Sequence, residues 1–148
     1  MTAVIQRVIN ANVKIDNSEE RSISNGLVIL LGIHKDDTEK DISYLVDKII
    51  SLRIFNDDND KMNYSLLDIN GSVLIISQLT LCGDFRRGRR PSFINASDPK
   101  KGKDLYINFV QMFKRRGLNV KTGEFGAHMN VNLINNGPVT FVIDSNDI

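Results

Sequence analysis

The alternation of apolar and polar positions predicts strands at both ends of the chain. At the N-terminus, AVIQRVI and ANVKI predict two strands, which are followed by a polar turn, DNSEERSISNG. The next segment, LVILLGI, is almost continuously apolar, which is typical of a strand covered on both faces. Toward the C-terminus, two or three further strands are predicted in NVKTG, HMNVNLI and PVTFVID.

Two other segments have helical periodicity. In the first, apolar residues recur at the spacing of one helical face. They are Ile42, Leu45, Val46, Ile49 and Ile50. Asp36, with Glu39 three residues later, has the spacing of a capping box, and this predicts a helix start near Asp37.

The second helix is predicted to begin after Asp98, an N-cap residue that precedes Pro99. Its apolar face is expected to consist of Leu105, Phe109, Val110 and Phe113. Three cations end its last turn, and Gly117 follows them as the residue that terminates the helix. No linker or repeat divides the chain, so one domain is expected over residues 1–148.

A long strand is predicted between the two helices. After the turn signal Asn70-Gly71, the segment SVLIISQLTL begins as an apolar run and becomes polar at Ser77, Gln78 and Thr80. Polar groups at the end of a buried strand need hydrogen-bond partners. This strand end therefore contacts either a ligand or neighbouring backbone.

The segment NNGPVTF places Gly137-Pro138 between two β-type runs. Because proline cannot donate to a β-ladder, it is confined to edges, strand starts and bulges. One interpretation is a hairpin, with the turn at Asn136-Gly137 and the return strand opening at Pro138. The other is a rigid corner, with a cis peptide bond, that presents backbone atoms to a ligand. The residues alone favour the hairpin, since only about 5–6% of X–Pro bonds are cis.

Charge limits the possible partners. The 148-residue chain has a formal net charge of +1, which argues against a surface that binds polyanions everywhere. Basic residues are nevertheless concentrated between two phenylalanines, Phe85 and Phe93: they are Arg86, Arg87, Arg89 and Arg90. Arginine pairs with phosphate and aromatic rings stack on unpaired bases, so this segment suits single-stranded RNA or a tRNA end. A solvated loop is the alternative.

Few residues could carry side-chain chemistry. The single cysteine, Cys82, excludes an internal disulfide and is expected to pack in the core. Neither of the two histidines, His34 and His128, lies in a nucleophile-elbow context, and His128 is the better pocket candidate. Metal-ligand spacing, Walker loops and dinucleotide motifs are absent, so no metal or cofactor is expected. The N-terminus has no long apolar run, which predicts a soluble, cytoplasmic protein without a membrane span.

Two motifs resemble a known family. SQLTL (77–81) and NNGPVT (135–140) are similar to the two signature motifs of the D-aminoacyl-tRNA deacylases, also called D-tyrosyl-tRNA deacylases. Supporting segments follow in the family's order: IQRV, GLVILLGI, LRIF, KMN, RRPSF and TGEFGAHMNV. The resemblance implies an α+β fold, namely a three-layer β/β/α sandwich of mostly antiparallel strands with two long helices. It also implies a homodimer whose active sites lie at the subunit interface.

The resemblance further implies an enzyme that hydrolyses the ester bond of D-aminoacyl-tRNA, with D-tyrosine, other D-amino acids and glycine as released groups. The implied catalytic residues are Ser77, Gln78 and Thr80. The implied substrate-binding residues are Arg7, Leu79, Phe125, Met129, Gly137 and Pro138, and Arg86, Arg87, Arg89 and Arg90 would bind tRNA. In the family the Gly-Pro bond is cis and its carbonyl oxygens enter the partner's site, where they exclude L-amino acids. Arg7 would hold that loop.

The mechanism implied by the resemblance uses the substrate's ribose 2′-hydroxyl and backbone N–H groups around the SQxT strand end, which stabilise the oxyanion. Direct attack by Thr80 is the competing mechanism. Leu79 stands where the family most often has phenylalanine, and this change could weaken adenosine binding. Ser77 and the segment GPVTF place the chain with the D-specific group rather than a paralogous one. The alternatives are a non-catalytic module that binds a tRNA end, and a small-molecule esterase, which would need a nucleophile–base pair that we do not find.

Overall fold

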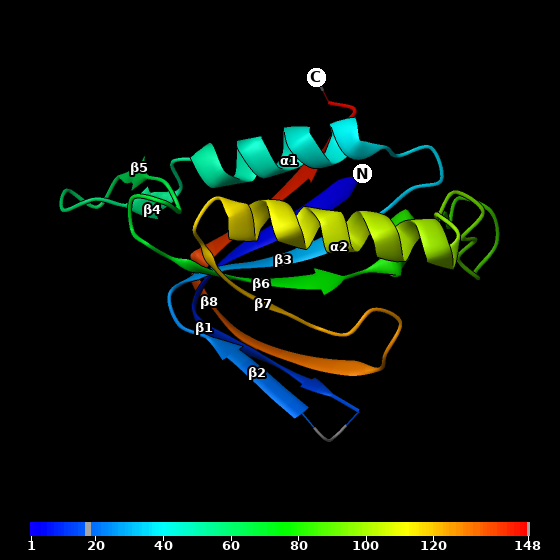
Figure 1. Cartoon of the computed structure of the whole chain (residues 1–148), viewed down its shortest axis with the longest axis horizontal. Coiled ribbons are helices and arrows are strands. Elements are labelled where there is room, and N and C mark those ends of the chain that lie inside the picture. Colours follow the sequence, from blue (N-terminus) through cyan, green and yellow to red (C-terminus); the bar gives the residue numbers. More distant parts are fainter. Residues whose placement is uncertain (17–18, 148) are drawn as a thin grey trace.

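A β-sheet covered by two helices dominates the computed structural model, which describes residues 1–16 and 19–147 (Figure 1). The helices are α1 (Glu39–Ser51) and α2 (Pro99–Arg115), and a short 3-10 helix, η1, spans Leu79–Cys82. The strands are β1 (Thr2–Ile15), β2 (Glu19–Ile23), β3 (Gly26–Gly32), β4 (Phe55–Asn56), β5 (Met62–Tyr64), β6 (Ser72–Ser77), β7 (Asn119–Thr122) and β8 (Met129–Asp144). The fold is thus mixed α+β with two long helices, as the sequence predicts.

Six strands form one sheet in the order β2-β1-β3-β6-β7, and β8 pairs with β1. The pairs that involve β1 are antiparallel, whereas β3, β6 and β7 run parallel to one another. Strand β8 pairs with both halves of β1, so the sheet curls over itself into a nearly closed, barrel-like form. In Figure 1 the helices lie above β3 and β6, while β2 and the lower part of β8 form the layer beneath.

Two apolar cores fill the spaces on either side of β3 and β6. The larger core packs the inner faces of α1 and α2 against the sheet, and its centre includes Phe109 and Phe113. The smaller core lies inside the curled part of the sheet and includes Val13, Val28 and Leu74. Strand β3 contributes to both cores, which explains its almost continuous apolar run.

The N-terminal strands differ from the sequence prediction. AVIQRVI and ANVKI belong to one strand, β1, because β8 pairs along both of them across two register shifts. The predicted polar turn contains strand β2, while residues 17 and 18 of that turn lie outside the described residues. Hydrogen bonding to β1 holds this polar segment in a strand despite its sequence.

The start of α1 also differs. Thr38, not Asp36, is the N-cap, and the capping box is completed by Asp41 rather than Glu39. Asp37 is not available for the cap because its carboxylate accepts from the Met1 ammonium at 2.7 Å and from the His34 N–H at 2.6 Å. By contrast, α2 begins with Asp98 as N-cap and Pro99 in its first turn, and Gly117 follows its end with φ 81°, as predicted.

The predicted strand SVLIISQLTL ends early. Strand β6 stops at Ser77, and Leu79–Cys82 turn into η1. Cys82 is buried, as expected, and its thiol donates to the Ile33 carbonyl at 3.4 Å. No helix among the described residues has the length and apolar character needed to cross a membrane.

Candidate active site

The end of β6 opens into a cavity of about 380 Å³. One wall consists of Ser77, Gln78, Leu79 and Thr80, which continue from β6 into η1. The opposite wall comes from the start of α2, from Phe125 in the loop between β7 and β8, and from Met129 at the start of β8. The structure therefore brings six of the sequence-predicted site residues around one cavity.

Two backbone N–H groups at the start of η1 have no hydrogen-bond acceptor within the described residues. The first amides of a helix have no intrahelical acceptor. The Gln78 N–H donates to the Leu31 carbonyl at 2.8 Å. The N–H groups of Leu79 and Thr80 donate to no acceptor among the described residues. Two free donors therefore lie beside the cavity.

The Thr80 hydroxyl is not activated by a base. Its hydrogen-bond partner is the side-chain amide of Gln78, which donates to Thr80 Oγ1. An amide does not take up a proton at neutral pH in either orientation, so it cannot deprotonate the hydroxyl. This arrangement suits a positioning role for Thr80 better than nucleophilic attack.

A buried tyrosine supports the aromatic wall. Tyr106 of α2 donates its hydroxyl to the Ile75 carbonyl at 2.6 Å, and its ring centroid lies 5.9 Å from that of Phe125. Burial raises the pKa of the Tyr106 phenol well above its ordinary value, so the group stays neutral and keeps donating. Phe125 is thus held against a rigid neighbour.

The loop that carries Phe125 is also fixed by Arg21 of β2. Its Nη1 donates to the Thr122 carbonyl at 2.9 Å, to Thr122 Oγ1 at 3.2 Å and to the Gly123 carbonyl at 3.1 Å. Glu19 binds the other side of the guanidinium at 3.0 and 3.2 Å. At Gly123 an added Cβ atom would lie 2.4 Å from Met129 Sδ, so a larger residue there would displace the Met129 side chain that lines the cavity.

The second motif forms a bulge rather than a hairpin. Gln6 pairs with Thr140 and Val8 pairs with Asn135, so a two-residue step on β1 faces a five-residue step on β8. The chain does not reverse at Asn136-Gly137, and the hairpin interpretation is wrong because β8 continues in one direction on both sides of the bulge. The Gly137-Pro138 bond is cis, and both residues are exposed.

Arg7 and Asn135 hold the bulge. Arg7 is only 6% exposed, and its Nε donates to the Asn136 carbonyl at 2.9 Å. Its Nη1 donates to the Ile54 carbonyl at 2.8 Å and to Asn56 Oδ1 at 2.9 Å. The Val139 N–H donates to Asn135 Oδ1 at 2.6 Å, which closes the bulge from the other side.

Within one chain the bulge lies away from the cavity. Arg7 pairs with Leu27, and Leu27 pairs with Val73, four residues before Ser77. At about 3.3 Å per residue, this offset is about 13 Å along the strands. Gly137, Pro138 and Arg7 are accordingly absent from the cavity lining.

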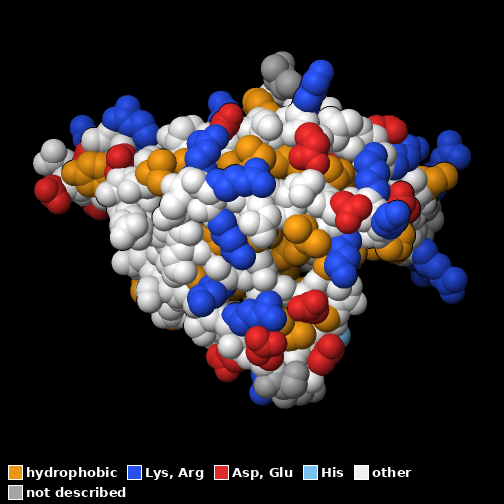
Figure 2. Space-filling model, viewed as in Figure 1, with side chains coloured by type: hydrophobic (Ala, Val, Ile, Leu, Met, Phe, Trp, Pro, Cys, Tyr) orange, Lys and Arg blue, Asp and Glu red, His pale blue; other side chains and the backbone are white. Residues whose placement is uncertain are grey.

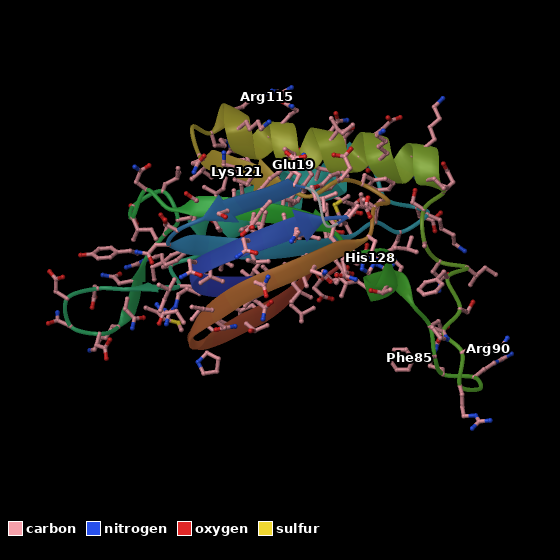
Figure 3. All side chains as sticks on the ribbon, turned by 90° about the horizontal axis from the view of Figure 1, so that it is seen from below. Glu19, Phe85, Arg90, Arg115, Lys121 and His128 are labelled. Atoms are coloured by element: carbon pink, nitrogen blue, oxygen red, sulfur yellow. The ribbon has the colours of Figure 1, made fainter. Side chains whose placement is uncertain are left out.

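The arginine-rich segment is a loop that projects from the body, as Phe85 and Arg90 show in Figure 3. Arg86 is engaged by Asp84, which it contacts at 2.9 and 2.7 Å. This hydrogen bonding lowers the pKa of the Asp84 carboxyl to about 2. No hydrogen bond or ion pair within the described residues engages the side chains of Arg87, Arg89 and Arg90, which leaves them free to meet a ligand.

The histidines lie outside the cavity lining. His128 is exposed, and its backbone carbonyl accepts from the Asp16 N–H at 3.0 Å, while His34 Nε2 lies 3.0 Å from Thr2 Oγ1. Sequence reasoning missed the two supporting residues, Arg21 and Tyr106. Arg21 falls in a segment that reads as a turn, and Tyr106 lies next to the predicted apolar face of α2, so neither had a distinctive local signal.

Comparison with known proteins agrees with the motifs. The family model described as D-Tyr-tRNA(Tyr) deacylase matches residues 4–144. A D-aminoacyl-tRNA deacylase of Thermosipho africanus is 56% identical over 148 residues, covering 100% of this chain and 99% of that protein. The protein of the same name from Clostridioides difficile is 51% identical over 145 residues, covering 98% and 97% of the two chains.

Solved structures share the fold. One described as a c-Myc DNA unwinding element binding protein superposes with a TM-score of 0.90 at 35% identity, covering 97% of this chain and 98% of the other. Another, described as a probable eukaryotic D-amino acid tRNA deacylase, has a TM-score of 0.84 over 97% of this chain and 100% of the other. At 19% identity the second likeness concerns the fold alone.

Proposed function

Because the chain belongs to the D-Tyr-tRNA(Tyr) deacylase family and is therefore an aminoacyl-tRNA hydrolase, we propose that it removes D-amino acids from tRNA during translation. The substrates are tRNAs esterified with D-tyrosine, other D-amino acids or glycine, and the products are the free amino acid and tRNA. This activity corresponds to chiral proofreading in the cytoplasm, and it uses no cofactor.

The observation that carries this proposal is the cavity at the end of β6, with the free amides of Leu79 and Thr80 on its wall. When water adds to the ester carbonyl, negative charge develops on the carbonyl oxygen, and two N–H donors stabilise it. The ester C–O bond then breaks and the ribose oxygen leaves with a proton. Among the described residues that line the cavity there is no His, Asp, Glu or Lys to act as a base, so we assign the relay of protons to the neighbouring ribose 2′-hydroxyl. Ser77, Gln78 and Thr80 position the substrate.

The chiral filter requires a second copy of the chain. The Gly137-Pro138 bulge is displaced from the cavity of its own chain, so its carbonyl oxygens serve a cavity only if they enter a partner's. Exposed apolar side chains flank the bulge and suit a subunit contact. They are Ile9, Ile134, Phe141 and Val142. In the homodimer, these carbonyls leave room for a D-amino acid, whereas the Cβ of an L-amino acid meets them.

The arginine-rich loop is the proposed contact for the single-stranded tRNA end. Arg87, Arg89 and Arg90 are free to pair with phosphates, and Phe85 offers an exposed ring for stacking. Replacing these three arginines with alanine should weaken tRNA binding and flatten its salt dependence, since each phosphate contact adds to the counterion-release slope. An unchanged slope of log K against log salt concentration would show that the loop is solvated and does not contact the phosphates of tRNA.

Deacylation of D- and L-tyrosyl-tRNA, measured side by side, tests the proposal. We expect rapid release of D-tyrosine while L-tyrosyl-tRNA decays at its spontaneous rate. The alternative, a non-catalytic module that binds the tRNA end, predicts tight binding with no acceleration of either reaction. Sedimentation at micromolar concentration tests the dimer, and an active monomer would refute the cross-subunit filter.

A further inference from the structure

Helix α2 is rich in positive charge although the whole chain is nearly neutral. Helix α2 and its C-cap carry six cationic side chains against one carboxylate, that of Asp104. The six are Lys100, Lys101, Lys103, Lys114, Arg115 and Arg116. Figure 2 shows blue side chains along this helix and on the strands below it, with red side chains among them. The excess of cations on α2, in a chain of net charge +1, makes this helix a local contact for an anion.

Most of these cations are unpaired. Arg116 is bound by Asp47, and Lys101 donates to the Lys35 carbonyl. Within the described parts of the chain, the side chains of Lys103, Lys114 and Lys121 take part in no hydrogen bond or ion pair, and all three are exposed. Lys121 lies on β7, and in Figure 3 it appears on the same side of the molecule as Arg115.

A groove lies beside two of these lysines, Lys103 and Lys114. It has a volume of about 200 Å³ and lies between α2 and the end of β7. Lys103 and Lys114 line it, eleven residues apart on one helix, which corresponds to about 16 Å. Its one acidic lining residue, Glu124, lies 3.7 Å from Arg21 Nη2 and is therefore partly neutralised.

The groove adjoins the candidate active site, because Phe125 lines both spaces and the start of α2 lines the cavity with Pro99 and Gly102 and the groove with Lys103. A nucleic acid whose 3′ end enters the cavity thus has a basic path along α2. The arginine-rich loop occupies a different side: Figure 3 shows Arg90 and Phe85 extending away from the side that carries Arg115 and Lys121.

We propose that the basic surface formed by Lys103, Lys114 and Lys121 binds the phosphate backbone of the tRNA acceptor-stem duplex, while the arginine-rich loop contacts the single-stranded end. This inference rests on the proposed function, since it assigns a second contact to the same substrate. Lys103 and Lys114 lie on one face of α2 about 16 Å apart, with Lys121 on the neighbouring strand. An extended basic surface of this kind suits a duplex, whose phosphates lie at regular intervals and are recognised by charge rather than by base sequence.

The test replaces Lys103, Lys114 and Lys121 with alanine and compares the variant with a control that loses Lys14, Lys40 and Lys61. The control removes the same charge from exposed positions on other elements. Two substrates are used for hydrolysis: D-tyrosyl-tRNA and the D-tyrosyl ester of adenosine. Two ligands are used for binding: an RNA minihelix that contains the acceptor stem and carries no amino acid, and a single-stranded oligonucleotide ending in CCA.

For the variant that lacks Lys103, Lys114 and Lys121 we expect KM for D-tyrosyl-tRNA to rise by about tenfold. The slope of log K against log salt concentration for minihelix binding should fall in magnitude by about 2 to 3, because three phosphate contacts are lost. Hydrolysis of the adenosine ester and binding of the oligonucleotide should stay unchanged. Equal behaviour of variant and control toward the minihelix would overturn the inference, as would a loss confined to the oligonucleotide.

The two proposals fail separately. If the unaltered protein hydrolyses neither ester, the proposed activity is refuted, but minihelix binding still decides whether this surface contacts a duplex. If the protein hydrolyses both esters and the lysine variant behaves as the control, only the duplex contact is refuted. Melting temperatures of the two variants confirm that both remain folded.

Discussion

Arg7 on β1 and Asn136 on β8 are joined by a 2.9 Å hydrogen bond from Nε to the carbonyl oxygen, directly beside Gly137-Pro138. The same guanidinium also bonds to the Ile54 carbonyl and to Asn56 Oδ1. One buried side chain therefore connects the bulge to the segment that follows α1. The shape of the bulge depends on a residue about 130 positions away in the sequence, as the two residue numbers show.

Replacing Arg7 with alanine should lower the free energy of unfolding by about 2–4 kcal/mol, because a buried acceptor left without its donor costs about 1–3 kcal/mol. D-tyrosyl-tRNA hydrolysis should fall with it, since the bulge loses its anchor. Arg53→Ala is the matched control, because Arg53 is exposed and its side-chain hydrogen bonds within the described residues go to Asn63. Urea unfolding and single-turnover deacylation measure both effects, and equal stability losses in the two variants would contradict this role.

Thr80→Ala should retain measurable turnover. The Gln78 amide donates to the Thr80 hydroxyl and cannot deprotonate it, so the hydroxyl positions groups rather than attacking the ester. We expect kcat to fall by less than about tenfold, whereas removing a covalent nucleophile costs on the order of 10⁶-fold. Single-turnover hydrolysis of D-tyrosyl-tRNA by the Thr80→Ala variant decides between a positioning role and a nucleophilic role for Thr80. An inactive variant that still binds tRNA would identify Thr80 as the nucleophile.

Gly137→Ala should abolish D-specific hydrolysis. Gly137 has a φ of 140°, and an added Cβ would lie 2.8 Å from Val139 Cγ2, so the bulge must shift. Gly117→Ala is the matched control, since Gly117 also has positive φ but an added Cβ meets nothing within 4 Å. Both variants should lose about 1–2 kcal/mol of stability from backbone strain. Only Gly137→Ala should lose activity, and full activity there would argue against a role for the bulge.

Arg21 should act as a positioning residue for the loop that carries Phe125. Arg21→Ala removes the three hydrogen bonds from Nη1, and we expect kcat to fall by about tenfold or more because cavity groups move out of place. KM for tRNA should change little. Glu19→Gln is the control, since it weakens the Arg21–Glu19 ion pair while leaving the contacts of Arg21 Nη1 with Thr122 and Gly123. Arg21→Lys keeps the charge but not the forked geometry, so it should restore activity only in part.

The Asp84–Arg86 pair predicts a pH dependence of the arginine-rich loop. The pKa of Asp84 is about 2 in the folded protein and about 3.9 in an unfolded chain. Because the folded pKa is lower, the pair stabilises the loop above about pH 4 and loses this effect as the pH falls toward 2. NMR titration of the Asp84 carboxyl should show the low midpoint. Arg86→Ala should raise the Asp84 midpoint toward the ordinary value of an aspartate. An unaltered midpoint would show that Arg86 does not cause the low pKa of Asp84.

Local signals in the sequence were sufficient for several elements. Asp98, Pro99 and Gly117 determine the limits of α2 because capping and φ preferences act within a few residues. The apolar run of β3 indicated burial on both faces, and the polar end at Ser77 and Gln78, for which the sequence predicted either a ligand or backbone contacts, lines a cavity. The two short motifs were also enough to identify the family, since they occur in order with their supporting segments.

Other features depended on contacts between distant residues. Asp36 and Thr38 both have capping chemistry, and the choice between them depended on Asp37, which binds the Met1 ammonium and the His34 N–H. The strand β2 and the continuity of β1 and β8 follow from pairing across the sheet, which no local pattern encodes. The same holds for Arg21, whose partners lie about 100 residues away by their numbers.

The sequence by itself thus determined the residue types of the candidate site: a polar strand end, a Gly-Pro segment and an arginine-rich loop, each specified within a short window. Only the tertiary structure decided which of these lie together. It placed Ser77 and Phe125 at one cavity and Gly137-Pro138 on a bulge about 13 Å away along the strands, because strand register sets positions in steps of about 3.3 Å. The physical reason is that burial and hydrogen bonding between distant segments, rather than local preference, determine register and cavity shape.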